Sequence, residues 1–280
     1  MFRYGGFALK ISKVLACILV VVAACVVAAC HAAPLSDDAD AGSDLPELKI
    51  GVSTLNPFFY IDENGDYKGI DAEIATEACR RAGYRPVFVE VSWSDRDEYL
   101  QNGSVDCLWN AFIKDGREDA YRWTDAYMQT NLRVIVTAQS PDQDVWDASG
   151  RGGIAVRAGS KIEEILLNSS GTSVVQVYSC GTFEMAETAF VKGYTNALGG
   201  HEVVLQRVID SYPGQFRFID GAITTADLAV AFSKDDDTRH WQDINDALDE
   251  MRADGTIAGI LAVYGADIPP GEAEEVSADA

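Results

Sequence analysis

The sequence predicts an α/β fold made of two similar α/β units in series. Short apolar runs typical of strands alternate with stretches of helical period along residues 48–109, and again along residues 153–211. The first series reads strand, helix, strand, helix, strand, which favours a parallel sheet with right-handed crossovers. A chain of 280 residues that is 48% hydrophobic and 10% aromatic can bury cores of this kind.

The first unit carries local signals for each element. Apolar residues alternate along 48–52, and a cluster of turn formers at 62–66 predicts a hairpin-like turn. Asp71 is predicted to cap the next helix, and Gly83 to end it. The expected elements are strands at 48–52, 87–91 and 105–109 and helices at 72–82 and 93–102.

The second unit follows a strand at 132–136 and a break at Ser140 and Pro141. A strand at 227–232 and two final helices then close the fold. The expected elements are strands at 153–156, 174–177 and 196–198 and helices at 161–167, 182–192, 203–211, 241–253 and 257–264.

Charge excludes one class of partner. The chain has 44 acidic and 22 basic residues, a net charge of −22. Nucleic acid binding needs clustered Lys and Arg, so we expect no nucleic acid partner.

The amino-terminal segment has the features of an export signal. Basic residues precede an apolar run that ends in small residues before Cys30, after which the chain turns acidic. The end of this run resembles the lipobox of bacterial lipoproteins, with Cys30 as the lipidated residue and Cys25 as an alternative. We therefore expect a lipoprotein signal peptide at 1–29, a flexible acidic linker at 30–46 and a disordered acidic tail at 268–280. An uncleaved membrane anchor is the other interpretation of the run.

Three cysteines remain in the body, Cys79, Cys107 and Cys180. Their number is odd, and no CxxC spacing indicates a metal site. An oxidising exterior would permit a disulfide between Cys79 and Cys107, and buried free thiols are the alternative.

Eight short motifs in order give the sequence a family resemblance. The chain from about residue 48 to 264 resembles family 3 of the bacterial extracellular solute-binding proteins, the receptors of polar amino-acid ABC transporters. The motifs are Asn56-Pro57-Phe58-Phe59, Gly65-Asp66-Tyr67-Lys68-Gly69-Ile70-Asp71, Val91-Ser92-Trp93, Gly103-Ser104-Val105-Asp106, Gly116-Arg117, Trp123-Thr124-Asp125-Ala126-Tyr127, Gly159-Ser160 and Arg252-Ala253-Asp254-Gly255-Thr256.

The resemblance implies a two-lobed, periplasmic-binding-protein-like (type II) fold with two hinge crossings. We expect the crossings near 137–142 and 221–227. The first lobe would then be discontinuous, at 47–138 and 224–267, and the second lobe would span 139–223.

The resemblance also implies a ligand site. At the position of Arg117, the family has an arginine that holds the ligand α-carboxylate, and a guanidinium can do this through two parallel hydrogen bonds. Trp93 would be an aromatic wall or a core residue, and Gly159 with Ser160 an anion clamp or an ordinary helix cap. The alternative for Arg117 is a surface salt bridge. The expected ligand contacts are Ser53, Asn56, Phe59, Trp93, Asn110, Phe112, Arg117, Gly159, Ser160, His201 and Glu202.

The sequence departs from the family where the ligand ammonium is usually neutralised. Ser53 and His201 stand near the positions of the usual acidic residues, although Glu202 could substitute after a slip of one residue. A desolvated ammonium without a partner is unfavourable by several kcal/mol. We therefore expect a ligand other than a common α-amino acid.

The expected function is that of a receptor. It would be a monomer, anchored by lipid to the outer face of the cytoplasmic membrane. By closure of two lobes it would capture an amino acid or related small carboxylated solute for an ABC permease, without cofactor or metal. The alternative is a dehydratase of the cyclohexadienyl or arogenate type, which would use His201 and Glu202 as a general acid pair.

Overall fold

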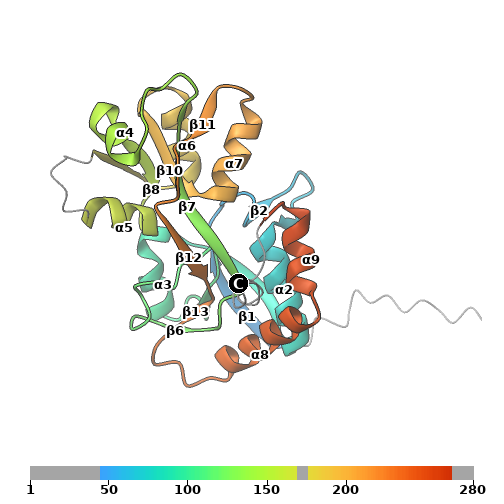
Figure 1. Ribbon diagram of the computed structural model, residues 1–280. Coiled ribbons are helices and arrows are strands. Elements are labelled where there is room, and N and C mark those ends of the chain that lie inside the picture. Colours follow the sequence, from blue (N-terminus) through green and yellow to red (C-terminus); the bar gives the residue numbers. More distant parts are fainter. Residues whose placement is uncertain (1–44, 169–175, 267–280) are drawn as a thin grey trace, which may run out of the picture. The chain divides into compact units, whose positions relative to one another are not determined.

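The computed structural model describes residues 45–168 and 176–266, whose course Figure 1 shows. The predicted signal peptide at 1–29, Cys25 and Cys30, most of the linker at 30–46 and the tail at 268–280 lie outside these residues. Within the described part of the chain, no helix is long and apolar enough to cross a membrane.

The first sheet has the strand order β4, β1, β5, β13, β6. β1 pairs in parallel with β4 and with β5, so Ile50 lies opposite both Phe88 and Cys107. β4, β1 and β5 are parallel, as predicted for this strand–helix series, whereas β13 is antiparallel to its two neighbours, so the complete sheet is mixed. The strands are β1 (Glu47–Val52), β4 (Arg85–Glu90), β5 (Cys107–Leu108), β6 (Arg122–Trp123) and β13 (Ala231–Phe232), with a separate hairpin of β2 (Tyr60–Ile61) and β3 (Tyr67–Lys68).

Helices α2, α8 and α9 pack together beside this sheet (Figure 1). α2 ends at Gly83, whose φ of 78° closes the helix in the left-handed region as predicted. Its start differs from the prediction, because Gly69 occupies the cap and Asp71 lies in the first turn. The buried Asp71 carboxylate accepts hydrogen bonds from the Ala111 N–H at 2.6 Å and the Tyr127 hydroxyl at 2.8 Å, so it stabilises a tertiary contact rather than the helix end. The helices are α2 (Ile70–Ala82), α3 (Arg96–Gln101), α8 (His240–Ala253) and α9 (Thr256–Val263).

The second sheet has the order β11, β7, β10, β8, β9, with β12 also paired to β7. β10, β8 and β9 are parallel. Gly199 in β10 permits close packing of α5, because an added Cβ would lie 2.7 Å from Cδ1 of Ile162. The elements are β7 (Met128–Thr137), β8 (Ile154–Arg157), β9 (Val177–Cys180), β10 (Ala197–His201), β11 (Phe216–Phe218), β12 (Thr224–Leu228), α4 (Val145–Gly152), α5 (Lys161–Asn168), α6 (Phe183–Val191) and α7 (Glu202–Ser211).

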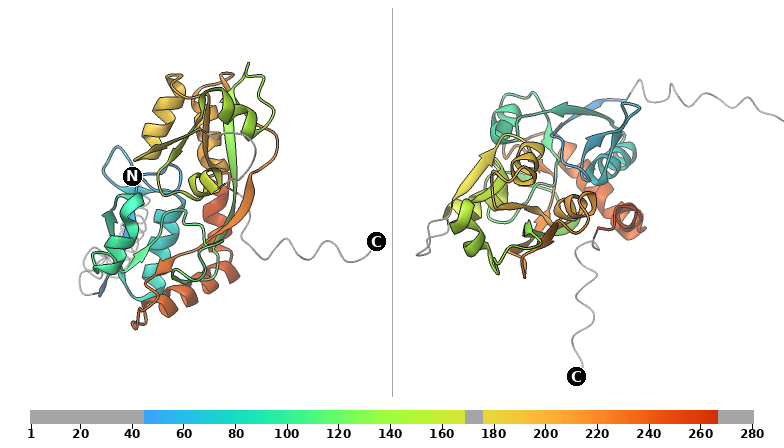
Figure 2. Two further views of the ribbon diagram at one scale, coloured as in Figure 1. Left: turned by 90° about the vertical axis from the view of Figure 1, so that its left-hand side faces the viewer. Right: turned by 90° about the horizontal axis from the view of Figure 1, so that it is seen from above.

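The two sheets form two lobes joined by the strand pair β7 and β12. We call the first sheet with α2, α3, α8 and α9 the first lobe, and the second sheet with α4 to α7 the second lobe. β7 and β12 run antiparallel between them, with Met128 opposite Leu228 and Leu132 opposite Thr224 (Figures 1 and 2). Because β7 already pairs with β10 from Leu132 onward, the first crossing lies earlier in the chain than the expected stretch 137–142.

The predicted strand at 227–232 divides into β12 and β13. Between them, the Ala229 N–H donates to the Phe112 carbonyl, and the Val230 N–H donates to the Thr124 hydroxyl. These bonds turn the chain from the second sheet into the first. Both residues are apolar and buried, so the hydrophobic pattern continues through the bend.

Cys79 and Cys107 are free thiols in the structure, as is Cys180. Cys79 on α2 and Cys107 on β5 are both fully buried in the core of the first lobe, where burial raises the pKa of both thiols. The possible disulfide between them is not formed in the structure. They pack as small apolar residues, which is the alternative that the sequence left open.

Candidate functional site

Polar residues of the two lobes meet at the carboxyl ends of parallel strands. Ser53 follows β1 and Asn110 follows β5 in the first lobe, whereas Arg157 ends β8 and His201 ends β10 in the second. Ligands of open α/β sheets bind at such strand ends. This region is therefore the candidate ligand site.

Arg157 joins the lobes at this point. Its Nη1 donates to Ser53 Oγ and to Asn110 Oδ1, both at 3.0 Å, although the residue is only 5% exposed. Ser53 Oγ in turn donates to Asn110 Oδ1 at 2.8 Å. Burial lowers the pKa of Arg157 well below its usual value, and the neighbouring Arg96 and Arg117 guanidiniums lower it further. A guanidinium is basic enough to stay charged at neutral pH despite such a shift.

Arg117 is also directed inward. Its side chain is 12% exposed, and its Nη2 donates to Glu164 Oε2 of the second lobe at 2.8 Å. The alternative, a surface salt bridge with Glu118 or Asp119, does not form, and Glu118 accepts from the Gly116 N–H. Burial, followed by the nearby Arg96, lowers the pKa of Arg117. The group predicted to hold a ligand carboxylate thus holds a carboxylate of the protein.

An aromatic pair lies beneath these guanidiniums. Trp93 and Phe112 are both buried and meet edge to face, with ring centroids 5.0 Å apart. The guanidinium carbon of Arg157 lies 4.8 Å from the Trp93 ring centroid, and that of Arg117 lies 5.4 Å from the centroid of Phe112. Arg96 lies over both rings, at 5.4 and 5.1 Å. The pair therefore supports three cations through cation–π contacts.

Gly159 and Ser160 both make contacts with Glu163 at the start of α5, as the helix-cap alternative predicted. The Ser160 hydroxyl accepts from the Glu163 N–H at 3.3 Å, as a helix cap does. The Gly159 N–H donates to the Glu163 carboxylate at 2.6 Å, so this amide also binds an anion. Gly159 has a φ of 73°, and an added Cβ would lie 2.8 Å from Nη1 of Arg96. Only glycine fits this turn without strain.

Three cavities adjoin Arg157. An outer cleft of about 510 Å³ opens between Ser53, Trp93 and Glu184. Two inner cavities of about 20 and 10 Å³ share Ser160, Lys161 and His201, and the smaller one also contacts Trp93, Phe112 and Arg117. A cavity of about 10 to 15 Å³ holds one water molecule, so a ligand that reaches Arg117 must move the side chains around it.

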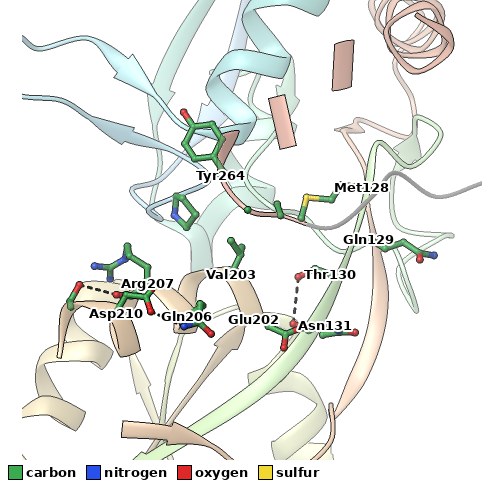
Figure 3. A pocket seen from close by; sticks show the side chains of 14 residues that line it. Met128, Gln129, Thr130, Asn131, Glu202, Val203, Gln206, Arg207, Asp210 and Tyr264 are labelled. Atoms are coloured by element: carbon green, nitrogen blue, oxygen red, sulfur yellow. Dashed lines mark hydrogen bonds between the residues drawn. The ribbon is translucent and has the colours of Figure 1, made fainter. Parts of the chain in front are cut away.

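His201 and Glu202 do not form an acid pair. His201 lines the two inner cavities, whereas Glu202 lines a separate groove of about 690 Å³ (Figure 3). Burial, with a smaller effect of Arg157, lowers the pKa of His201 to about 3, so the imidazole is neutral. Glu202 accepts hydrogen bonds from Asn131 at 2.7 Å and from Arg133 at 2.5 Å. This geometry does not favour the dehydratase alternative.

Two further expected contacts lie away from the site. Phe59 is buried in the core, where its ring packs against those of Tyr67 and Phe88. Asn56 precedes Pro57 through a cis peptide bond and lines none of the cavities around Arg157. Their positions in the family motif reflect the local chain path rather than a contact with the cavities.

The prediction missed three cations of the site, Arg96, Arg157 and Lys161. Arg157 had a usable signal, because it is a charged residue at the carboxyl end of a predicted strand, two positions before Gly159. Lys161 directly follows Ser160 in the predicted clamp. Arg96 had no local signal, since its place in a short polar helix is typical of solvent-facing charge.

Two lobes with polar residues at facing strand ends are typical of two-lobed solute-binding proteins. A profile of the bacterial extracellular solute-binding proteins, family 3, matches residues 48–267. The chain therefore belongs to this family, and the predicted periplasmic-binding-protein-like (type II) fold is confirmed.

Individual relatives are distant but cover most of the chain. The L-cystine-binding protein TcyA of Bacillus subtilis (strain 168) is 26% identical over 231 residues, which cover 76% of this chain and 79% of the relative. The lysine/arginine/ornithine-binding periplasmic protein of Escherichia coli (strain K12) is 24% identical over 239 residues, or 82% and 92% of the two chains. The crystal structure of Tv2483 bound to L-arginine superposes with a TM-score of 0.73 at 27% identity and covers 80% of this chain and 93% of its own.

Proposed function

We propose that this protein is the extracytoplasmic receptor of an ABC importer that captures an amino acid or a related small carboxylated solute by closure of its two lobes. Family membership and the names of the binding-protein relatives support a receptor rather than an enzyme. The permease of the importer is the expected partner, and the receptor acts as a monomer.

The interlobe contact of Arg117 carries this proposal. Arg117 belongs to the first lobe and meets a carboxylate, that of Glu164, which belongs to the second. A ligand carboxylate that replaced Glu164 would occupy the same buried guanidinium while the lobes close around it. Charge-assisted hydrogen bonds of this type are about twice as strong as neutral ones, so one such contact can select a carboxylated ligand.

Calorimetry on the full-length chain in detergent, against the common amino acids and small carboxylic acids, tests the proposal. We expect at least one compound to bind and Arg117→Ala to weaken its binding by about tenfold or more. Arg80→Ala is the matched control, since the Arg80 side chain is exposed and paired with Glu77. An absence of binding throughout the panel, or an unchanged affinity in Arg117→Ala, would contradict the proposal.

The anchoring proposal is separate from the ligand. We place the lipid on Cys30, with Cys25 as the alternative, and the body on the outer face of the cytoplasmic membrane. Metabolic labelling with a radioactive fatty acid should be lost in Cys30→Ala and kept in Cys25→Ala. The opposite pattern would assign the lipid to Cys25. An absence of label in the wild-type protein would exclude a lipoprotein.

A further inference from the structure

We call the region around the two inner cavities, with the aromatic pair Trp93 and Phe112, the inner end of the cleft. Four cations lie there, Arg96, Arg117, Arg157 and Lys161. Arg117 and Lys161 share one carboxylate, because both donate to Glu164, at 2.8 and 2.7 Å. The chain has twice as many acidic as basic residues, so a cluster of four cations is not expected from its average composition. Its charge therefore needs a local reason.

The two remaining arginines of this cluster bond to neutral oxygens. Arg157 donates to the Ser53 hydroxyl and the Asn110 amide, and Arg96 donates to the carbonyls of Trp93 and Gly159. The contact of Arg96 with the carboxylate of Asp97 is long, at 4.0 Å. Within the residues that the structure describes, the four cations thus have one carboxylate in direct hydrogen-bonding contact.

The other acidic side chains nearby already accept hydrogen bonds or are exposed to solvent. The oxygens of Asp71 accept from Ala111 and Tyr127, and burial raises the pKa of Asp71 to about 7, so it is partly protonated at neutral pH. Glu163 accepts from the Gly159 N–H. Glu90 and Glu184 line the outer cleft but are exposed, and exposed charges interact weakly through water. The buried part of the site keeps an excess of positive charge.

We propose that the ligand is a small dicarboxylate, with one carboxylate for Arg117 and the other for Arg157. This inference rests on the proposed function and narrows its ligand class. One inner cavity contacts both arginines, together with Trp93 and Phe112 on which they lie. A single carboxylate can form a bidentate pair with one guanidinium and leaves the other buried cation uncompensated. A second carboxylate removes that imbalance.

Within the residues that the structure describes, no buried carboxylate beside the inner cavities is free to pair with an ammonium group, because Asp71, Glu163 and Glu164 are already bonded. Ser53 Oγ already accepts from Arg157 and donates to Asn110, and His201 is neutral. An amino group placed here would lose its hydration beside like charges, which is unfavourable. An α-amino group on the dicarboxylate is therefore not required and weakens binding in the inner cavity.

Calorimetry with matched ligands on the full-length chain in detergent tests the dicarboxylate. We expect glutarate to bind about tenfold or more tightly than pentanoate, which has the same carbon count and one carboxylate less. L-Glutamate, which adds an ammonium to glutarate, should bind no more tightly than glutarate. In Arg157→Gln we expect the preference for glutarate over pentanoate to fall to within about threefold, whereas Arg80→Gln should keep it.

The outcomes separate this inference from the function on which it rests. If pentanoate or a neutral amino acid binds as tightly as glutarate, the dicarboxylate inference is wrong and the receptor proposal stands. If no carboxylate binds, both are wrong. Because Arg157 also joins the lobes, Arg157→Lys provides a folded, charged variant that should keep most of the preference. If a well-folded Arg157→Lys loses the preference for glutarate as fully as Arg157→Gln does, the guanidinium has only a geometric role. If the wild type, Arg157→Gln and Arg157→Lys all show the same preference, the inference is wrong.

Discussion

The inner end of the cleft and the groove of Figure 3 lie between the same two lobes, but their charged side chains are paired differently. In the groove, Glu202 is paired with Arg133, Arg207 with Glu187, and Asp210 accepts from Gln206. At the inner end, Arg157 is held by neutral oxygens alone. The groove is larger, yet two of the three charged side chains that line it, Glu202 and Arg207, are paired with opposite charges of the protein. The pairing of charges therefore distinguishes the candidate ligand site from the groove better than cavity size does.

The largest expected difference between the two regions is in stability. Asn110 is fully buried, accepts from Arg157 and donates to the Ser53 carbonyl at 2.8 Å. Asn110→Leu removes these bonds and leaves a buried guanidinium short of a partner, so the free energy of unfolding should fall by about 3 kcal/mol. Urea unfolding followed by circular dichroism measures this.

Asn131→Leu is the matched change in the groove. Asn131 also uses both ends of its amide, with Glu202 and Thr225, but its side chain is only partly buried and water can replace the bonds. We expect a loss of about 1 kcal/mol. Equal losses in the two variants would contradict the distinction between the regions.

A smaller difference should be seen as the pH changes. The pKa of His201 is about 3 in the folded protein against 6.5 in the unfolded chain, so the unfolded state binds more protons between these values. The stabilising effect of the neutral imidazole is complete above pH 6.5 and is lost as the pH falls towards 3. Asp71 acts in the opposite direction between its unfolded pKa of 3.8 and its folded pKa of about 7, since its proton is held more tightly in the folded state.

His201→Gln separates the two effects, because it removes the first and keeps the second. Between pH 6.5 and 4, the free energy of unfolding of the variant minus that of the wild type should rise by up to about 1.4 kcal/mol per pH unit of acidification. Urea titrations of both proteins at pH 7, 6 and 5 give this difference. A constant difference across the three pH values would mean that the pKa of His201 is the same in the folded protein as in the unfolded chain.

The smallest expected effect concerns ligand affinity. Glu164 competes with a ligand carboxylate for Arg117, and its side chain is 37% exposed, so the competing pair is weak. Glu164→Gln should tighten the binding of glutarate by about two- to fivefold in calorimetry. Glu202→Gln makes the same change in the groove and should leave the affinity unchanged. A weaker affinity in Glu164→Gln would show that Glu164 orients Arg117 rather than competing for it.

The sequence predicted the positions of most strands and helices, because periodicity and caps are local properties. It did not predict the division of the strand at 227–232, since Ala229 and Val230 keep the apolar pattern through the bend. Asp71 was assigned to a helix cap because Asp is favoured both at helix caps and at buried positions where a side chain accepts hydrogen bonds. In each case the competing tertiary contact leaves no local trace.

The candidate site was predicted only in part for the same reason. Arg117 and Trp93 came from positions in a family motif, and both line the inner cavity. The contact of Glu164 with Arg117 depends on how two lobes meet, and the residues are 47 positions apart in the chain. Arg157 had a strand-end signal, but the family motif in this region includes only Gly159 and Ser160, so Arg157 was not considered. Which charges lack a counter-charge can be judged only in three dimensions.

The pairing of β7 with β12 restricts how the protein can open. The two connections are hydrogen-bonded to each other from Met128 to Leu132, so they form a single ribbon rather than two independent tethers. A two-stranded ribbon bends readily out of its own plane and resists sliding of one strand along the other, because sliding breaks every rung of the ladder. The pairing therefore opposes sliding of one lobe past the other more strongly than it opposes bending of the ribbon.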